Sequence, residues 1–347
     1  MRKPVIELKS INKTYNRTGL FGRKKQSFTL PAIENLSLTL REGEILGLIG
    51  ESGSGKTTAG KSILKLTDID SGSIHLYEQD ITDLSENKFR PMRTDIQMIF
   101  QDLDAALNPN MKINNILTEI LTRHHKENKN EINKRLLKLI EDVHLDPKIL
   151  ERFPAELSGG QKRRIAIASA LAVEPKIIIA DEPTTGLDNY TQSLIMQLIL
   201  DLQKNNNLSM ILISHDLQLV KKMCQRIAVM YLGNIIELGT ADEVSQKPAH
   251  PYSELLWQSH LKHTATHTNI TRKHDIKSGL FDFERPGEGC RFSPRCKRYL
   301  ELGKPDKCIS KDSRPDLITF SSEDEVKMRS NENNKNEEHI VACHFPL

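Results

Sequence analysis

Three short apolar runs recur along the chain, at Ile45–Ile49 and at residues 177–180 and 210–213. Each is too short for a helix and is rich in Ile, Leu or Met, as strands buried on both faces of a parallel sheet are. A helical pattern follows two of these runs, so strands and helices alternate. The alternation predicts an α/β fold.

Other periodicities surround these strands. Residues 5–8 and 36–40 alternate apolar and polar positions, which predicts half-exposed strands, and the basic, glycine-containing segment 17–26 between them is expected to be a solvated loop. Residues 113–143 carry apolar side chains at spacings of three and four, which predicts helices with one face in the core. Residues 226–237 resemble a hairpin that turns at Gly233 and Asn234, and residues 321–338 read as a polar loop.

Composition narrows the class of protein. The chain has 347 residues, of which 37% are hydrophobic and 27% charged, so a folded globular protein is expected. A net charge of +3 gives no reason to expect nucleic acid or lipid as a partner. The longest apolar stretch, residues 165–173, is shorter than the roughly 18–20 residues of a spanning helix, and Glu7 and Lys9 interrupt any signal peptide. We therefore expect a cytoplasmic chain whose cysteines are free or bound to metal.

A phosphate-binding loop follows the first buried strand. Gly50-Glu51-Ser52-Gly53-Ser54-Gly55-Lys56-Thr57 fits the pattern G-x-x-x-x-G-K-[ST] and precedes an apolar-periodic helix. Its glycines allow backbone N–H groups to surround phosphate oxygens at the start of a helix. Lys56 is expected to reach the β- and γ-phosphates, and the hydroxyl of Thr57 is expected to coordinate Mg²⁺.

Two carboxylates end the second buried strand. Asp181 and Glu182 follow three isoleucines and Ala180, and the ends of such strands face the ligand crevice. We expect Asp181 to hold Mg²⁺ through water and Glu182 to act as the general base for the attacking water.

The segment Leu157-Ser158-Gly159-Gly160-Gln161 predicts a second anion site. Ser158 can cap the helix that begins near Gln161 and aim its N–H groups at a phosphate. One chain with two phosphate sites makes sense if each site completes the other across a dimer. The alternative is an ordinary Ser-Gly-Gly turn.

Taken together, these motifs over residues 5–260 resemble the ATPase of an ATP-binding-cassette (ABC) transporter. The resemblance implies a P-loop core with an antiparallel β subdomain and a helical subdomain near residues 102–164, in an ATPase domain spanning 1–248. It also implies that Tyr15 stacks on adenine, that Gln101 senses the γ-phosphate and Mg²⁺, that Asp188 reaches the opposite subunit, and that His215 contacts the γ-phosphate. Sheet packing for Tyr15, a surface position for Gln101, helix capping for Asp188 and a structural role for His215 are the alternatives.

The expected catalytic residues are therefore Lys56, Gln101, Glu182 and His215, and the expected Mg²⁺ ligands are Thr57, Gln101 and Asp181. The expected nucleotide contacts are Tyr15, Gly50, Glu51, Ser52, Gly53, Ser54, Gly55, Lys56, Thr57, Thr58, Gln101, Ser158, Gly159, Gly160, Gln161, Asp181 and Asp188.

Finer features are similar to the oligopeptide/dipeptide and nickel importer subgroup. They include Glu51 in the phosphate loop, Phe100-Gln101-Asp102, and His250-Pro251-Tyr252, which opens that subgroup's C-terminal extension. We expect an irregular extension over residues 249–347. Cys290, Cys296, Cys308 and Cys343 lie within it, and the resemblance implies a [4Fe–4S] cluster there, with Zn²⁺ or no metal as alternatives.

The resemblance implies an ATP- and Mg²⁺-dependent subunit that drives peptide import. Its partners would be membrane permease subunits, a second homologous ATPase in a heterodimer, and indirectly an extracellular solute-binding protein, with the chain peripheral on the cytoplasmic face of the membrane. Import of nickel, a metallophore or another small solute is the alternative. A non-transport ABC ATPase is less consistent with a single cassette and this extension.

Overall fold

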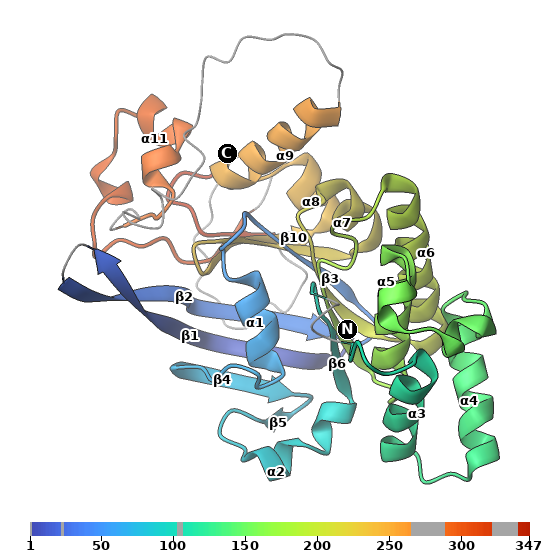
Figure 1. The fold of residues 1–347 in the computed structure, drawn as a ribbon. Helices are drawn as coiled ribbons and strands as arrows, with labels where there is room; N and C mark the ends of the chain where they lie inside the picture. The colour runs from blue at the N-terminus through green and yellow to red at the C-terminus, as the bar shows by residue number, and fades with distance from the viewer. Residues whose placement is uncertain (1, 22–23, 103–106, 265–288, 321–338) are drawn as a thin grey trace.

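The computed structural model describes residues 2–21, 24–102, 107–264, 289–320 and 339–347. Within them the strands form two sheets, and Figure 1 shows the smaller sheet lying across the larger one. None of the described helices is long and apolar enough to cross a membrane.

The larger sheet has eight strands, and its centre is parallel. Their order is β11 (Ile318–Thr319), β12 (Ile340–Val341), β10 (Asn234–Thr240), β9 (Arg226–Tyr231), β3 (Ile45–Ile49), β8 (Ser209–Ile213), β7 (Ile177–Asp181) and β6 (Ile96–Ile99). All residues of β3, β7 and β8 are buried, because helices or the smaller sheet cover both faces. The predicted parallel core strands are therefore confirmed.

The smaller sheet is antiparallel and has the order β2 (Lys24–Arg41), β1 (Pro4–Phe21), β4 (Ser71–Leu76) and β5 (Gln79–Asp80). The expected loop over residues 17–26 is wrong, because β1 and β2 continue their pairing through Arg17↔Phe28 to Phe21↔Lys24. Two strands that satisfy each other's backbone hydrogen bonds can extend as a ribbon beyond the sheet, whatever the polarity of their side chains.

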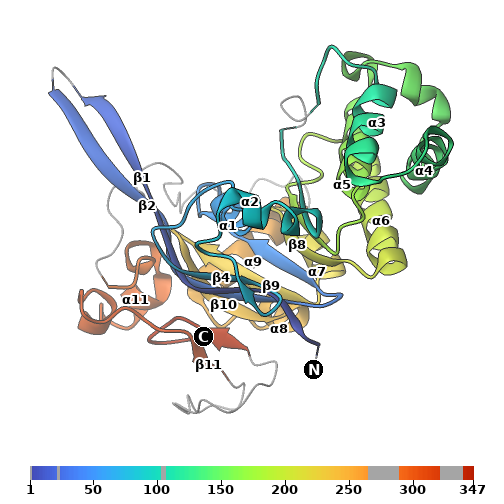
Figure 2. The same ribbon diagram turned by 90° about the horizontal axis from the view of Figure 1, so that it is seen from below.

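Ten α-helices lie within the described residues. They are α1 (Lys56–Ile63), α2 (Glu86–Phe89), α3 (Ile113–His124), α4 (Lys129–Asp142), α5 (Gly159–Leu171), α6 (Asn189–Asn206), α7 (Leu217–Met223), α8 (Ala241–Gln246), α9 (Pro251–Thr264) and α11 (Lys297–Glu301). Short 3₁₀ turns lie at Met92–Thr94, Pro147–Glu151, Pro154–Glu156, Ser293–Arg295 and Asp306–Cys308. Figure 2 shows α3 and α4 set to one side of the sheets with α5 and α6.

The helical prediction for residues 113–143 is confirmed by α3 and α4. The expected apolar face of α4 is buried at Ile132, Leu136, Leu139 and Ile140, and Val143 is buried directly after the helix. The buried apolar side chains form a main core cluster and a second cluster. The second cluster joins the two sheets through α1, whose Ala59 and Ile63 pack with residues of β1, β2, β7 and β8. This packing fixes the start of α1, and thus the phosphate loop, against both sheets.

Two further expectations concern turns. The β9–β10 hairpin is confirmed, but Tyr231 pairs with Asn234, so the turn lies at Leu232 and Gly233, one residue earlier than expected. Both turn residues have positive φ (44° and 88°), the backbone of a tight hairpin turn. The predicted polar loop 321–338 lies outside the described residues.

The described C-terminal segments, residues 289–320 and 339–347, pack against the rest of the described chain. Phe292 is buried in the main core cluster, and strand β12 pairs with β10, adding to the larger sheet. The carboxylate of Glu237, fully buried on β10, accepts hydrogen bonds from the N–H groups of Ala249 and His250 and lies 2.6 Å from the ring of His339. The C-terminal segment is therefore tied to the sheet that carries the phosphate loop.

Candidate nucleotide site

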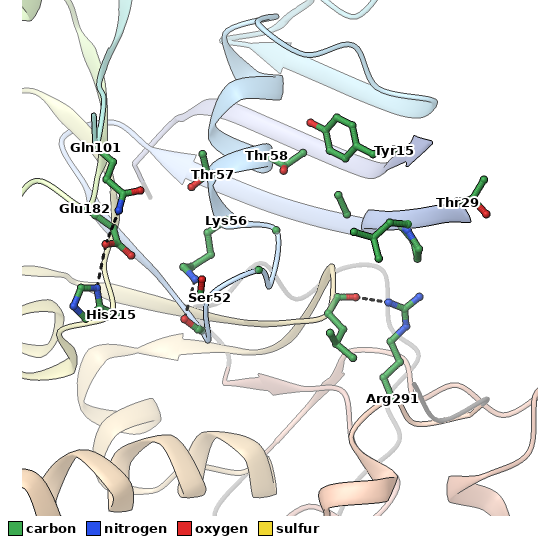
Figure 3. Close-up of a pocket in the computed structure, with 17 residues that line it drawn as sticks. Tyr15, Thr29, Ser52, Lys56, Thr57, Thr58, Gln101, Glu182, His215 and Arg291 are labelled. Atoms are coloured by element: carbon green, nitrogen blue, oxygen red, sulfur yellow. Dashed lines mark hydrogen bonds and ion pairs between the residues drawn. The ribbon is translucent and has the colours of Figure 1, made fainter. Parts of the chain in front are cut away.

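A pocket of about 710 Å³ opens between the phosphate loop, the β1–β2 ribbon and the ends of the parallel strands (Figure 3). Among the expected site residues, those that line it are Tyr15, Gly50, Ser52, Gly53, Gly55, Lys56, Thr57, Thr58, Gln101, Glu182 and His215. The structure therefore gathers into one cavity expected residues from five separate places in the sequence. Nucleotide-sized space and convergent polar groups make it the candidate active site.

The phosphate loop joins β3 to α1. A Cβ atom added at Gly50 would lie 2.1 Å from the carbonyl oxygen of Met230, and one at Gly55 would lie 2.2 Å from that of Ala32, so glycine is required at both positions. Lys56 is buried, and its Nζ donates hydrogen bonds to the carbonyls of Gly50 and Glu51, each 2.8 Å away. Burial lowers the pKa of Lys56 despite nearby carboxylates. An incoming phosphate would add counter-charge beside this buried cation.

Thr57 and Asp181 bring two oxygens together at the end of β7. The hydroxyl of Thr57 donates to Asp181 Oδ1 over 3.2 Å, and Asp181 is 2% exposed. Burial raises the pKa of Asp181 above its ordinary value. A divalent cation would stabilise the ionised carboxylate, and hydroxyl plus carboxylate oxygens suit Mg²⁺.

Glu182 lies between Gln101 and His215, as Figure 3 shows, and also contacts Thr185. Its Oε2 accepts a hydrogen bond from the Thr185 hydroxyl at 2.6 Å, lies 3.2 Å from His215 Nδ1 and lies 3.4 Å from Gln101 Nε2. Burial raises the pKa of Glu182, but the hydrogen bonds of Thr185 and His215 leave it lowered overall. The carboxylate is thus held ionised and oriented at the edge of the pocket.

Ser158 and Asp188 both cap helices outside this pocket. Ser158 Oγ accepts from the N–H of Gln161 at 3.3 Å and Gln161 Oε1 accepts from the N–H of Ser158 at 3.1 Å, which forms a capping box on α5. Asp188 caps α6 by accepting from the N–H of Thr191 at 3.0 Å. The capping predicted for Ser158 and the capping alternative for Asp188 are both seen. Neither residue, nor Gly159, Gly160 or Gln161, lines the pocket of its own chain.

Six lining residues were not expected from the sequence: Thr29, Leu30, Pro31, Ala32, Leu232 and Arg291. The first four come from β2, Leu232 comes from the β9–β10 turn, and Arg291 comes from the C-terminal region. Arg291 donates to the carbonyl oxygen of Leu232 and pairs with Glu34. No local motif marks these residues, because their partners lie far away in the sequence.

The four C-terminal cysteines line one second, smaller pocket, together with His250 and Phe292. The N–H of Cys290 donates to the carbonyl oxygen of Cys308 at 2.9 Å. Burial raises the pKa of Cys290 to about 11 and that of Cys343 to about 12, and repulsion by neighbouring cysteines adds to both. Among the described residues, however, no three His, Cys, Asp or Glu side chains stand close enough to hold a single metal ion.

Cys224 is a separate case. It is 6% exposed in the main core, and burial raises the pKa of its thiol. The interpretation of Cys224 as an apolar core residue is therefore confirmed.

Known proteins are similar to this chain in both sequence and fold. Residues 33–185 match the ABC transporter family, and residues 236–301 match the oligopeptide/dipeptide transporter C-terminal region. The oligopeptide transport ATP-binding protein AppF of Bacillus subtilis is 36% identical over 347 residues, covering 99% of this chain and 98% of AppF. The dipeptide transport ATP-binding protein DppF of Lactococcus lactis is 44% identical over 260 residues, covering 74% of this chain and 81% of DppF.

Among solved structures, the dimeric ATP-binding cassette MJ0796 bound to ADP and Pi superposes with a TM-score of 0.60 at 29% identity, covering 68% of this chain and 98% of that one. The cbiO1 protein of Clostridium perfringens gives a TM-score of 0.61 at 26% identity, covering 76% of this chain and 98% of its own. The chain therefore belongs to the ABC transporter ATPase family and carries the C-terminal region of its oligopeptide/dipeptide branch.

Proposed function

We propose that this chain binds and hydrolyses ATP to drive an ABC importer for oligopeptides or dipeptides. The observation that carries the proposal is the convergence on one pocket of the phosphate loop and Glu182, with Asp181 buried directly behind Thr57 and hydrogen-bonded to its hydroxyl. The names of its relatives, which are peptide transport ATP-binding proteins, support the peptide class. The chain would act at the cytoplasmic face of the membrane, attached to permease subunits.

The site residues take the following roles in this proposal. Lys56 and the loop N–H groups bind the β- and γ-phosphates, while Thr57 and Asp181 hold Mg²⁺, Asp181 through water. Glu182 removes a proton from the attacking water. Its position supports this role, because the carboxylate is ionised and faces the pocket beside Thr57 and Asp181.

Three further residues complete the pocket. His215 and Gln101 contact the γ-phosphate from either side of Glu182, and Gln101 also approaches Mg²⁺. Tyr15, whose residue surface is 37% exposed at the pocket, stacks on adenine. An exposed aromatic ring in a ligand cavity favours stacking over packing within the sheet.

The second phosphate site would act across a dimer. Ser158, the two glycines and Gln161 form the N-terminus of a 13-residue helix and line no part of their own pocket, so a partner's nucleotide is their natural ligand. A Cβ atom added at Gly160 would lie 2.8 Å from Thr191 Cγ2, so this segment touches the helix that Asp188 caps. The Ser158 segment and Asp188 would both face a second, homologous ATPase subunit in a heterodimer. In each subunit of this kind, residues 1–248 would form the ATPase domain and residues 249–347 the extension.

Reconstitution with the permease subunits and binding protein of a peptide importer tests this function. Vesicles that contain the complex and internal ATP should accumulate a labelled oligopeptide presented with its binding protein, and the Glu182→Gln complex should not. Accumulation of Ni²⁺ or a metallophore in place of peptide would assign another solute. ATP hydrolysis without any coupling to a permease would refute the transport function.

The cysteines form a separate part of the proposal, a [4Fe–4S] cluster held by Cys290, Cys296, Cys308 and Cys343. Four partly buried cysteines that line one pocket support such a group, because a cluster of four irons spaces its thiolates more widely than a single ion does. The bound cluster would cross-link the extension and would stabilise the thiolate forms.

Anaerobic purification tests the cluster. Brown protein with absorbance near ~400 nm is expected, and the Cys290→Ser/Cys296→Ser variant should lose the colour but keep ATP binding. Colourless protein with stoichiometric zinc, or with no metal, would contradict the cluster.

A further inference from the structure

The phosphate loop contains an acidic residue at a position where a negative charge opposes nucleotide binding. Glu51 lies between Gly50 and Ser52, which both line the nucleotide pocket. A carboxylate there repels a triphosphate through space. The residue must therefore be neutralised or held away if the loop is to bind ATP well.

Arg295, from the C-terminal region, meets this carboxylate directly. Its Nη1 donates to Glu51 Oε2 and its Nη2 donates to Glu51 Oε1, each over 2.9 Å. This paired geometry is the strongest form of an arginine–carboxylate contact and fixes both the charge and the direction of the carboxylate. The two residues are 244 positions apart in the sequence.

The surroundings of Arg295 favour a persistent pair. The Arg295 side chain is 11% exposed, and its guanidinium lies 5.9 Å from the ring centre of Tyr231 and 5.8 Å from that of Phe292. The two rings pack edge to face with centres 5.4 Å apart. A buried stem and two aromatic faces restrict the guanidinium, so little conformational entropy is lost in forming the ion pair.

The backbone of Glu51 is held from outside the loop as well. Its N–H donates to the hydroxyl of Tyr252 at 2.9 Å, and Tyr252 is fully buried on α9. Tyr252 in turn packs on Tyr231, with ring centres 4.6 Å apart. The ring of Tyr231 therefore lies against both residues that hold Glu51. Arg295 pairs with the Glu51 side chain, and Tyr252 binds its backbone N–H.

We propose that Arg295 is a positioning residue of the nucleotide site, which neutralises and orients Glu51 so that the phosphate loop accepts the charge of ATP. The C-terminal region is then part of the ATP site. This inference rests on the proposed function, because it requires that the pocket bind ATP. Arg295 need not touch the nucleotide to act in this way.

The size of the effect follows from Coulomb's law. One uncompensated carboxylate about 10 Å from MgATP, which carries about two net negative charges, weakens binding roughly tenfold at an effective dielectric constant of about 50 near the protein surface. The loss should be smaller for ADP, which carries fewer charges, and should shrink in high salt because the repulsion is screened.

A double-mutant cycle on the full-length protein tests the inference. The Kd of MgATP is measured by titration calorimetry for wild type, Arg295→Gln, Glu51→Gln and the double variant. Arg295→Gln should weaken ATP binding about tenfold and raise KM with little change in kcat. Glu51→Gln should bind no more weakly than wild type, and the double variant should return to within about threefold of wild type.

Lys297→Gln is the matched control. The Lys297 side chain is 88% exposed and its ammonium pairs with Glu301 on the same short helix, so the Kd should not change. Arg295→Lys provides a second variant in case Arg295→Gln does not fold. It keeps the charge but loses the paired geometry, and a loss of about threefold is expected.

Two results would overturn the inference. Unchanged ATP affinity in folded Arg295 variants would show that the ion pair has no bearing on the nucleotide. A double variant as weak as Arg295→Gln alone, with the same loss for ADP and in high salt, would assign Arg295 a purely structural role. If wild type itself fails to bind ATP, the proposed function fails instead, and these two cases are distinct.

Discussion

Replacing Glu182 by Gln removes one charge and leaves the shape of the site nearly intact. The side chain keeps its length, and its amide oxygen can still accept the 2.6 Å hydrogen bond of the Thr185 hydroxyl. The variant lacks the carboxylate that can take a proton from the attacking water beside Thr57 and Asp181. We therefore expect ATP to bind normally while the chemical step slows.

The expected slowing is on the order of 10²–10⁴-fold, the usual contribution of a general base. At about 1.36 kcal/mol for each tenfold, this corresponds to roughly 3–5 kcal/mol of lost transition-state stabilisation. ATP affinity should hold or improve, because one negative charge leaves the neighbourhood of the phosphates. The combination should trap an ATP-bound dimer.

The dependence on pH provides an independent check. Burial opposes ionisation of Glu182, but hydrogen bonds from Thr185 and His215 prevail and lower its pKa below the ordinary value of 4.5. A lowered pKa keeps the base ionised, so its contribution is present above 4.5 and is lost only as the pH falls through the lowered value. The variant should lack this acidic limb.

The assay is single-turnover release of phosphate from the assembled complex, with nucleotide binding measured separately. Glu151→Gln is a suitable control, since that carboxylate is 71% exposed and pairs with Lys112. Near-normal turnover by Glu182→Gln would refute the assignment and make His215 the next candidate base.

Three further changes test other parts of the structure. Ser158→Arg should abolish dimer-dependent hydrolysis while the monomer's nucleotide affinity survives, and full-rate hydrolysis by isolated monomers would contradict a shared site. Gly47→Ala should lower the free energy of unfolding by about 1–3 kcal/mol, because the new Cβ would lie 2.4 Å from Val220 Cγ1. An unchanged midpoint in a denaturant titration would show that β3 and α7 can move apart without cost. Burial lowers the pKa of His250 to about 4, so stability should fall by up to about 3 kcal/mol as the pH drops from 6.5 toward 4, and His250→Asn should flatten that part of a melting-temperature profile.

The parts of the fold that could be predicted from the sequence are those that depend on residues close together in the chain. The apolar runs of β3, β7 and β8 specify buried strands because each residue there is apolar and faces a covered side of the sheet. The capping box of Ser158 and Gln161 is similarly local, since both partners lie within one helical turn. Such features depend on neighbours a few residues away.

The rest depends on contacts between distant segments. The β1–β2 ribbon continues through a basic, glycine-containing segment because its backbone groups pair with each other, which side-chain polarity does not reveal. Arg291 lies at the nucleotide pocket and Arg295 at the phosphate loop in a segment that Phe292 anchors in the main core. A sequence shows an arginine beside each of two cysteines, but not which carboxylate each one meets.

The pairing of β12 with β10 has a consequence for how copies of this protein behave together in concentrated solution. Strand β10 has seven residues, five of them buried, and an open edge of that kind is a template for another molecule's strand. Along the described part of the sheet, the two-residue strands β12 and β11 lie outside β10, and the four-residue β6 forms the opposite margin. Margins this short offer an incoming strand few backbone partners. Removing residues 339–347 would uncover β10 and leave Glu237 buried without its histidine, so a shortened chain should precipitate where the full one stays dispersed.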